Sequence, residues 1–138
     1  MAHWLLKSEP SAYSWDLLVK DKHTSWTGVR NPQASANLKA MKVGDQCFFY
    51  HSGEGKAVVG IAEIIRESFP DPTAGAGDPW VAVDVKALTP LKTPVTLAAI
   101  KAEPKLKHMT LVKLSRLSEQ PVAAAEWKIV CQMGGVAP

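Results

Sequence analysis

The stretch that decides the fold is QCFFYHSGEGKAVVGIAEIIR, residues 46–66. Its first part is rich in aromatic side chains and follows a Gly44-Asp45 turn, so residues 46–52 are predicted to form a strand. A turn at residues 52–55 leads into a second strand over residues 56–66, whose apolar residues fall on both faces, as in a buried central strand. Gly60 within it indicates a bulge or a close backbone approach. The centre of the fold is therefore predicted to be an antiparallel hairpin.

Hydrophobic periodicity and capping residues place further elements on both sides of this hairpin. The predicted strands are residues 3–7, 80–88 and 111–117, and the predicted helices are residues 14–20, 32–42, 96–102 and 121–132. Ser14 and Asn31 are the expected N-caps of the first two helices, and Pro32 suits a first helical position. A loop rich in Pro, Gly and Asp fills residues 70–79. Together these elements predict an α+β domain on a small, strongly bent sheet or open barrel.

Length and composition limit the class of protein. The 138 residues suit a single domain over 1–138, and the 46% hydrophobic and 21% charged contents are ordinary for a globular chain. No apolar run reaches the roughly 18 residues of a membrane helix, and the first ten residues do not resemble a secretory signal. We therefore expect a cytoplasmic monomer without membrane contact. Cys47 and Cys131 fit reduced thiols, with one disulfide as the alternative.

No metal or cofactor site is predicted. The four histidines are scattered along the chain and no CxxC pair occurs. Charge is distributed unevenly, however, although the net charge is only +3. Seven cations against one acid lie between Lys86 and Arg116. A basic face of this kind suits nucleic acid, and a solvated lysine-rich surface is the competing interpretation. The candidate phosphate contacts are Lys86, Lys105, Lys107 and Lys113.

The segment Trp26-Thr27-Gly28-Val29-Arg30-Asn31-Pro32 combines features of a recognition pocket. It places an aromatic ring and a guanidinium beside the N-terminus of the helix at residues 32–42, a position that suits an anion or a polar ring. Gly28 allows an unusual backbone conformation or close ligand approach. Trp26 could instead be a core residue. Arg30 could instead form a structural ion pair with Glu9 or Asp16.

Polar residues also follow three predicted strands. These groups are Lys7-Ser8-Glu9-Pro10, Tyr50-His51-Ser52 and Ser115-Arg116-Leu117-Ser118. On a strand, Tyr50 and Ser52 share one face and His51 points to the other. Our hypothesis is that these strand ends and the Trp26–Asn31 turn converge at one mouth of the barrel. Stacking and a few hydrogen bonds there would recognise a planar base.

Several separate motifs follow one another along the chain. They are His3-Trp4-Leu5-Leu6-Lys7-Ser8-Glu9-Pro10, Tyr13-Ser14-Trp15-Asp16, Trp26-Thr27-Gly28-Val29-Arg30-Asn31, Gly44-Asp45, Tyr50-His51-Ser52, Arg116-Leu117-Ser118 and Gln120-Pro121-Val122. In this order they resemble the EVE domain family. The resemblance runs nearly end to end. It implies a PUA-like fold, a bent antiparallel or mixed sheet or pseudo-barrel with peripheral helices. It also implies kinship with YTH domains, which read a methylated base in RNA.

The resemblance further implies a pocket for a modified base, with modified cytosine in DNA favoured. The candidate ligand-binding residues are Lys7, Ser8, Trp26, Gly28, Arg30, Asn31, Tyr50, His51, Ser52, Arg116 and Ser118. Glu119 departs from the small apolar residue expected there, and an acid at this position would alter affinity for phosphate near Arg116.

The favoured function is a non-enzymatic nucleic-acid-binding module. The first alternative is a small amidohydrolase acting on a modified nucleoside, as in related PUA-like enzymes that use a Lys, a hydroxyl and a Glu. Lys7, Ser8 and Glu9 would supply these groups, although Lys7 and Ser8 point to opposite faces of a strand. The second alternative is a protein-interaction domain.

Overall fold

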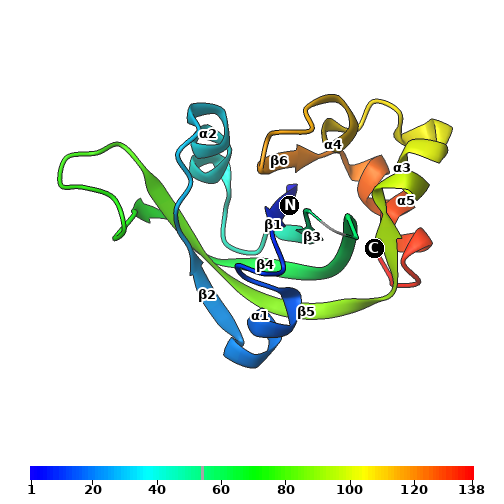
Figure 1. Ribbon diagram of the computed structural model, residues 1–138, viewed down its shortest axis with the longest axis horizontal. Helices are drawn as coiled ribbons and strands as arrows, with labels where there is room; N and C mark the ends of the chain where they lie inside the picture. The colour runs from blue at the N-terminus through cyan, green and yellow to red at the C-terminus, as the bar shows by residue number, and fades with distance from the viewer. Residues whose placement is uncertain (54) are drawn as a thin grey trace.

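The computed structural model describes residues 1–53 and 55–138; Glu54, in the predicted 52–55 turn, lies outside the described residues. The described strands form one sheet in the order β2-β5-β4-β3-β1-β6 (Figure 1). Their bounds are β1 His3–Ser8, β2 His23–Trp26, β3 Gln46–His51, β4 Ala57–Pro70, β5 Val81–Thr96 and β6 Glu119–Val122. The helices are α1 Trp15–Asp21, α2 Pro32–Ala40, α3 Leu97–Ala102, α4 Thr110–Lys113 and α5 Ala124–Met133, with a 3-10 turn η1 at Pro104–Leu106.

The predicted hairpin is confirmed as the centre of the sheet. β3 and β4 pair antiparallel, with a register shift after Phe49, and β4 pairs antiparallel with β5 through several further shifts. Gly60 lies at one of these shifts, where a Cβ would come within 2.5 Å of the Trp15 ring of α1. The absence of a side chain at Gly60 therefore lets α1 pack directly on the sheet.

The sheet is mixed because β1 runs parallel to β3 and antiparallel to β6. Parallel neighbours end at the same edge of a sheet, and Ser8 accordingly pairs with His51. The carboxyl ends of β1 and β3 therefore lie side by side.

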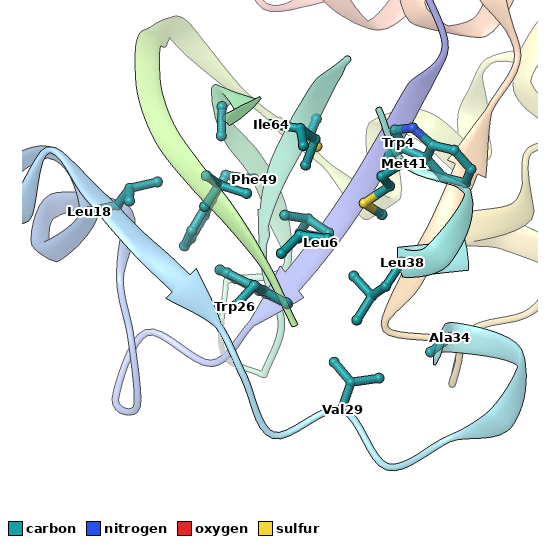
Figure 2. Close-up of a cluster of buried hydrophobic side chains, with 14 of the residues drawn as sticks. Trp4, Leu6, Leu18, Trp26, Val29, Ala34, Leu38, Met41, Phe49 and Ile64 are labelled. Carbon is teal, nitrogen blue, oxygen red and sulfur yellow. The ribbon is translucent and has the colours of Figure 1, made fainter. Parts of the chain in front are cut away.

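Alternating side chains fill two cores, one on each face of the sheet. Leu6 and Phe49 belong to the first core, which α1 and α2 cover, and Figure 2 shows part of it. Leu5 and Phe48 belong to the second, which lies under α3, η1, α4 and α5. Those C-terminal helices gather at one end of the curved β4–β5 ribbon, and the 71–80 loop projects from the other (Figure 1).

The two cysteines are free and lie in different cores. Cys47 belongs to the first core and Cys131 to the second, so the sheet separates them. The expectation of reduced thiols is confirmed, and the alternative of a disulfide is wrong.

The two edge strands of the sheet approach each other across the first core. The indole Nε1 of Trp26, at the end of β2, donates to Glu119 Oε2 of β6 at 2.9 Å. Asn37 of α2 donates to the Glu119 carbonyl at 2.7 Å. These bonds hold the two edges of the bent sheet together at a seam between β2 and β6. The two strands do not pair with each other, so the barrel is open at this seam.

Two predictions near the end of the chain need correction, and one strand there was not predicted. Residues 111–117 are not a strand: they hold the end of α4 and a turn, in which Leu111 packs into the second core. The last strand is β6, where the edge position tolerates Pro121. The final helix begins at Ala124 rather than at residue 121, because Pro121 and Val122 pair with β1.

Two strands differ from prediction in the middle of the chain. β2 was not predicted, since only four residues form it and its outward residues, His23 and Ser25, are polar. β5 runs on to Thr96 rather than ending at residue 88, past Pro90 and Pro94. β2 pairs with β5 only as far as Lys86; beyond it no described strand pairs with that side of β5, which can therefore hold prolines.

Candidate functional site

The carboxyl ends of β1 and β3 are surrounded by three adjoining depressions. Lys7 lines two of them. The third depression shares Glu9 with one of these two and Ser52 with the other. In sheets with parallel strands, ligands favour this position, where the strands end and loops rise from them. The predicted convergence of the first two strand ends is therefore present.

The first depression, the β1–β2 pocket, has a volume of about 450 Å³. This lies within the range of small-molecule sites, roughly 300–1,000 Å³. It is bordered by the end of β1, the loop that follows and the strand β2. Its lining residues are Lys7, Ser8, Glu9, Ala12, Tyr13, Thr24, Ser25, Trp26 and Thr27.

Trp26 gives the β1–β2 pocket a fixed aromatic wall. The ring is only 8% exposed and meets Phe49 edge to face, with centroids 5.7 Å apart. Its Nε1 hydrogen bond to Glu119 holds the indole in one orientation. Both interpretations of Trp26 therefore apply: it is a core residue, and it lines the pocket.

Glu119 supports this wall from behind. Its side chain is buried, and it accepts hydrogen bonds from Trp26 Nε1 and Ser118 Oγ. Burial raises the pKa of Glu119, against the opposing effect of the two hydrogen bonds. From the sequence, Glu119 was expected to alter affinity for a phosphate near Arg116. In the structure its carboxyl accepts a hydrogen bond from Trp26, which lines the pocket.

The opposite wall is the loop between β1 and α1. Ser8 Oγ donates to the Tyr13 carbonyl at 2.6 Å, and the Tyr13 hydroxyl donates to Asp21 at 2.9 Å. These two bonds fasten the loop to β1 and to the end of α1. The pocket is thus bounded by aromatic rings whose positions are fixed and by hydroxyl groups at its rim.

The second depression, here called the lysine pocket, is small, about 110 Å³. It is lined by Lys7, Tyr50, Ser52, Lys56, Leu97, Leu111 and Ser115. Lys7 Nζ donates to the Ser115 carbonyl at 2.6 Å and lies 5.8 Å from the centre of the Tyr50 ring. Burial lowers the pKa of Lys7, the Glu119 charge opposes this, and the positive charge of Lys56 adds to it.

Arg30 and Gly28 have structural partners that the sequence analysis did not identify. Arg30 forms its ion pair with Asp71 at 3.0 Å, rather than with Glu9 or Asp16. The Gly28 N–H also donates to Asp71, and Gly28 has a positive φ of 84°. Asp71 is buried; its hydrogen bonds from Thr73, Gly28 and Arg30 outweigh burial and hold its pKa well below the usual range. This cluster ties the 71–80 loop to the start of α2.

The remaining predicted ligand residues lie around these pockets. Asn31 caps α2 by accepting from the Ala34 N–H, and with Arg116 it lines a separate, open depression beside α4. His51 accepts from the Trp15 N–H through Nε2, so it holds α1. Ser118 donates to Glu119. Thus Lys7, Ser8 and Trp26 share one pocket, Lys7, Tyr50 and Ser52 share the next, and the other six candidates lie outside both.

The predicted phosphate-contacting lysines are all exposed but are spread over several elements. Lys86 is on β5, Lys105 in η1, Lys107 just after η1, and Lys113 at the end of α4. Lys113 alone borders one of the depressions described here, the open one with Arg116.

The geometry disfavours the hydrolase alternative. Lys7 Nζ and Ser8 Oγ point to opposite faces of β1, and each donates to a backbone carbonyl, of Ser115 and of Tyr13. A nucleophile and its base must lie within hydrogen-bond reach of each other, and these two groups do not.

Sequence reasoning did not include several pocket residues among its candidates. Tyr13, Thr24, Ser25, Thr27 and the supporting Glu119 belong to this group, whereas Glu9 was considered for the hydrolase alternative. Thr24 and Trp26 are the inward residues of β2, so recognising that short strand by its alternation would have added Thr24.

Within residues 1–53 and 55–138, no group of three or more His, Cys, Asp or Glu side chains is arranged to hold a metal ion. None of the helices in this described part is long and apolar enough to cross a membrane.

The sequence profile described as the EVE domain matches residues 2–133. Human thymocyte nuclear protein 1 is 33% identical over 165 residues, which cover 96% of this chain and 73% of the human protein. A Rhodopseudomonas palustris protein solved by NMR is 60% identical, with a TM-score of 0.93 over 98% of this chain and 94% of that one.

A crystal structure of human thymocyte nuclear protein 1 in complex with DNA containing 5-methylcytosine is 32% identical, with a TM-score of 0.90 over 100% of both chains. The YTH domain of Zygosaccharomyces rouxii MRB1, solved with N6-methyladenosine RNA, is 17% identical, with a TM-score of 0.60 over 99% of this chain and 86% of that domain. This last likeness concerns the fold alone, and it confirms the predicted PUA-like architecture.

Proposed function

This chain belongs to the EVE domain family, and from that membership we propose that it is a non-enzymatic nucleic-acid-binding module that reads a modified base. Modified cytosine in DNA is the favoured ligand. The base enters the β1–β2 pocket and stacks on Trp26, while hydroxyl groups at the rim contact its polar edge.

The observation that carries this proposal is the position of Trp26. Its ring lines a pocket of suitable volume, and its indole is held by a buried carboxylate rather than being free to rotate. A preformed aromatic wall stacks on a base without first being ordered, so less affinity is lost on binding. The human relative, solved with DNA that contains 5-methylcytosine, supports the choice of ligand.

The test compares binding to matched oligonucleotides by the wild type and a Trp26→Phe variant. The probes are single- and double-stranded DNA and RNA with an unmodified, 5-methyl, 5-hydroxymethyl or N6-methyl base. The wild type should prefer one modified probe. Trp26→Phe should lower this preference at least about threefold, because base–aromatic stacking is worth about 1–3 kcal/mol and the smaller ring, without Nε1, keeps only part of it.

Trp127→Phe is the matched control, since Trp127 is also a buried tryptophan but belongs to the second core. Near-ultraviolet circular dichroism should show that both variants are folded. Equal binding of every probe by the wild type, or an unchanged preference in folded Trp26→Phe, would contradict the proposal.

A further inference from the structure

We propose that the lysine pocket is a phosphate subsite, which binds one backbone phosphate of the strand whose base occupies the β1–β2 pocket. The choice of a nucleic-acid phosphate rests on the proposed function. The choice of a phosphate group rests on the chemistry of the pocket itself.

Tyr50 is the first observation. The side chain is only 3% exposed, and its hydroxyl has no hydrogen-bond partner among residues 1–53 and 55–138. Tyr50 lines the lysine pocket, and its hydroxyl oxygen is not fully enclosed, so it can take a partner from the pocket. A group that enters the pocket and accepts a hydrogen bond would supply one.

The charge of the pocket specifies the kind of acceptor. Lys7 and Lys56 both line it, and none of its described lining residues is an acid. Lys7 Nζ uses one donor on the Ser115 carbonyl and keeps two more. Ser52 and Ser115 add hydroxyl groups at the rim. Two ammonium groups with three hydroxyl groups match an oxyanion with several acceptor oxygens.

The size of the pocket is also suitable. Its volume of about 110 Å³ would hold roughly three to four water molecules at the ~30 Å³ each occupies in liquid water. This admits a phosphate group but is far smaller than the 450 Å³ of the β1–β2 pocket. The two pockets therefore suit different parts of a nucleotide.

The position of Lys7 joins the two pockets. It lines both of them, and the next residue, Ser8, points into the β1–β2 pocket while the Lys7 ammonium lies in the other. A nucleotide bound at the end of β1 can therefore place its base on one side of the strand and a neighbouring phosphate on the other.

The main experiment replaces single phosphates of the preferred modified oligonucleotide with neutral methylphosphonates. At one position beside the modified base, the replacement should weaken wild-type binding roughly tenfold, because hydrogen bonds to charged groups are the stronger ones. In Lys56→Ala, the same methylphosphonate should cause little further loss of affinity. The slope of log binding constant against log salt concentration should be smaller in magnitude than that of the wild type by about 0.9. Tyr50→Phe should also weaken binding while it preserves the aromatic ring.

Lys101→Ala is the matched control, because Lys101 is an exposed lysine on nearby α3 that does not line the lysine pocket. It should keep the full sensitivity to the methylphosphonate. If Lys56→Ala keeps it as well at every position, the phosphate subsite is wrong, even where the preference for a modified base persists. If coupling to Lys56 appears without any preference for a modified base, the subsite stands and the base-reading function fails.

A second arm titrates inorganic phosphate into the ¹⁵N-labelled chain. Saturable shifts of the Ser52 and Lys56 amides, lost in Tyr50→Phe, would support the subsite. Such shifts without coupling to any backbone phosphate would show a free-anion site and would overturn the proposal as stated.

Discussion

At the residue scale, the site depends on side chains with two roles. Trp26 is part of the first core and also the wall of the β1–β2 pocket. Glu119 is buried like a core residue, yet its carboxylate fixes the indole. Such double roles limit what a sequence reveals, because a hydrophobic pattern identifies Trp26 as buried but gives no sign that Glu119 is. The sequence pointed to Glu119 only as a departure from the EVE pattern.

The Glu119 carboxylate makes the first prediction. Glu119→Gln keeps an acceptor for the Trp26 indole and removes a buried charge, so the free energy of unfolding at neutral pH should change by less than about 1 kcal/mol. Glu119→Ala leaves the indole N–H without a partner and should cost about 1–3 kcal/mol. Urea unfolding measures both, and a large loss in Glu119→Gln would contradict the account.

The buried Glu119 carboxyl also predicts that stability depends on pH. The pKa of Glu119 is raised in the folded protein, so its contribution to stability decreases as pH rises from the ordinary carboxyl pKa through the raised one. Glu119→Gln should remove this part of the pH dependence. Unfolding free energies of the wild type and the variant should therefore differ in slope across mildly acidic pH, and parallel curves would exclude the buried titration.

Gly60 makes a prediction about packing. In Gly60→Ala the new methyl group would lie 2.5 Å from Trp15 ring atoms, so α1 must shift. Overpacking of this kind costs about 1–3 kcal/mol. Adding Trp15→Phe should recover part of the loss. It should not do so for Gly28→Ala, where the space is open and only the positive φ opposes a side chain. Thermal unfolding of the four variants decides, and equal effects of Trp15→Phe in both backgrounds would exclude the contact.

At the element scale, the sequence predicted best where local signals and packing agreed. The β3–β4 hairpin, α1 with its Ser14 cap, α2 with its Asn31 cap and α3 occur close to where expected. The errors fall where tertiary contacts override local pattern. The short β2 exists only because β5 pairs with it, and β6 contains a buried acid and a proline that no strand pattern favours.

The Asp71 cluster gives the prediction at this scale. Asp71→Asn should weaken the bonds from Arg30 and Gly28 and cost about 1–3 kcal/mol, since a buried charge-assisted network is disrupted. Amides of the 71–80 loop should then exchange hydrogen faster. A loop with unchanged protection would show that Asp71 does not anchor it.

The pKa of Asp71 is lowered in the folded protein, so its stabilisation is complete above the ordinary carboxyl pKa of about 3.9 and is lost as pH falls below it. The difference in unfolding free energy between wild type and Asp71→Asn should accordingly shrink in strong acid. A difference that stays constant down to the lowest pH at which the protein folds would contradict this linkage.

At the scale of the whole molecule, the bent sheet brings together residues that are far apart in sequence. The parallel β1 and β3 end side by side, and closure of the seam brings Trp26 of β2 to the same region. The convergence of Lys7, Ser8 and Trp26 follows from this topology. Arg30 and Asn31 follow Trp26 in the chain, but Arg30 pairs with Asp71 and Asn31 caps α2, so neither lines the β1–β2 pocket.

The central claim is that the β1–β2 pocket reads a modified base, and chemical-shift mapping tests it most directly. The ¹⁵N-labelled chain is titrated with two duplexes that differ only in one cytosine methyl group. The account predicts that the shifts that differ between the two titrations are largest at the Trp26 indole and at the Ser8 and Thr27 amides. Identical shifts with both duplexes, or differences centred away from the ends of β1 and β2, would contradict it.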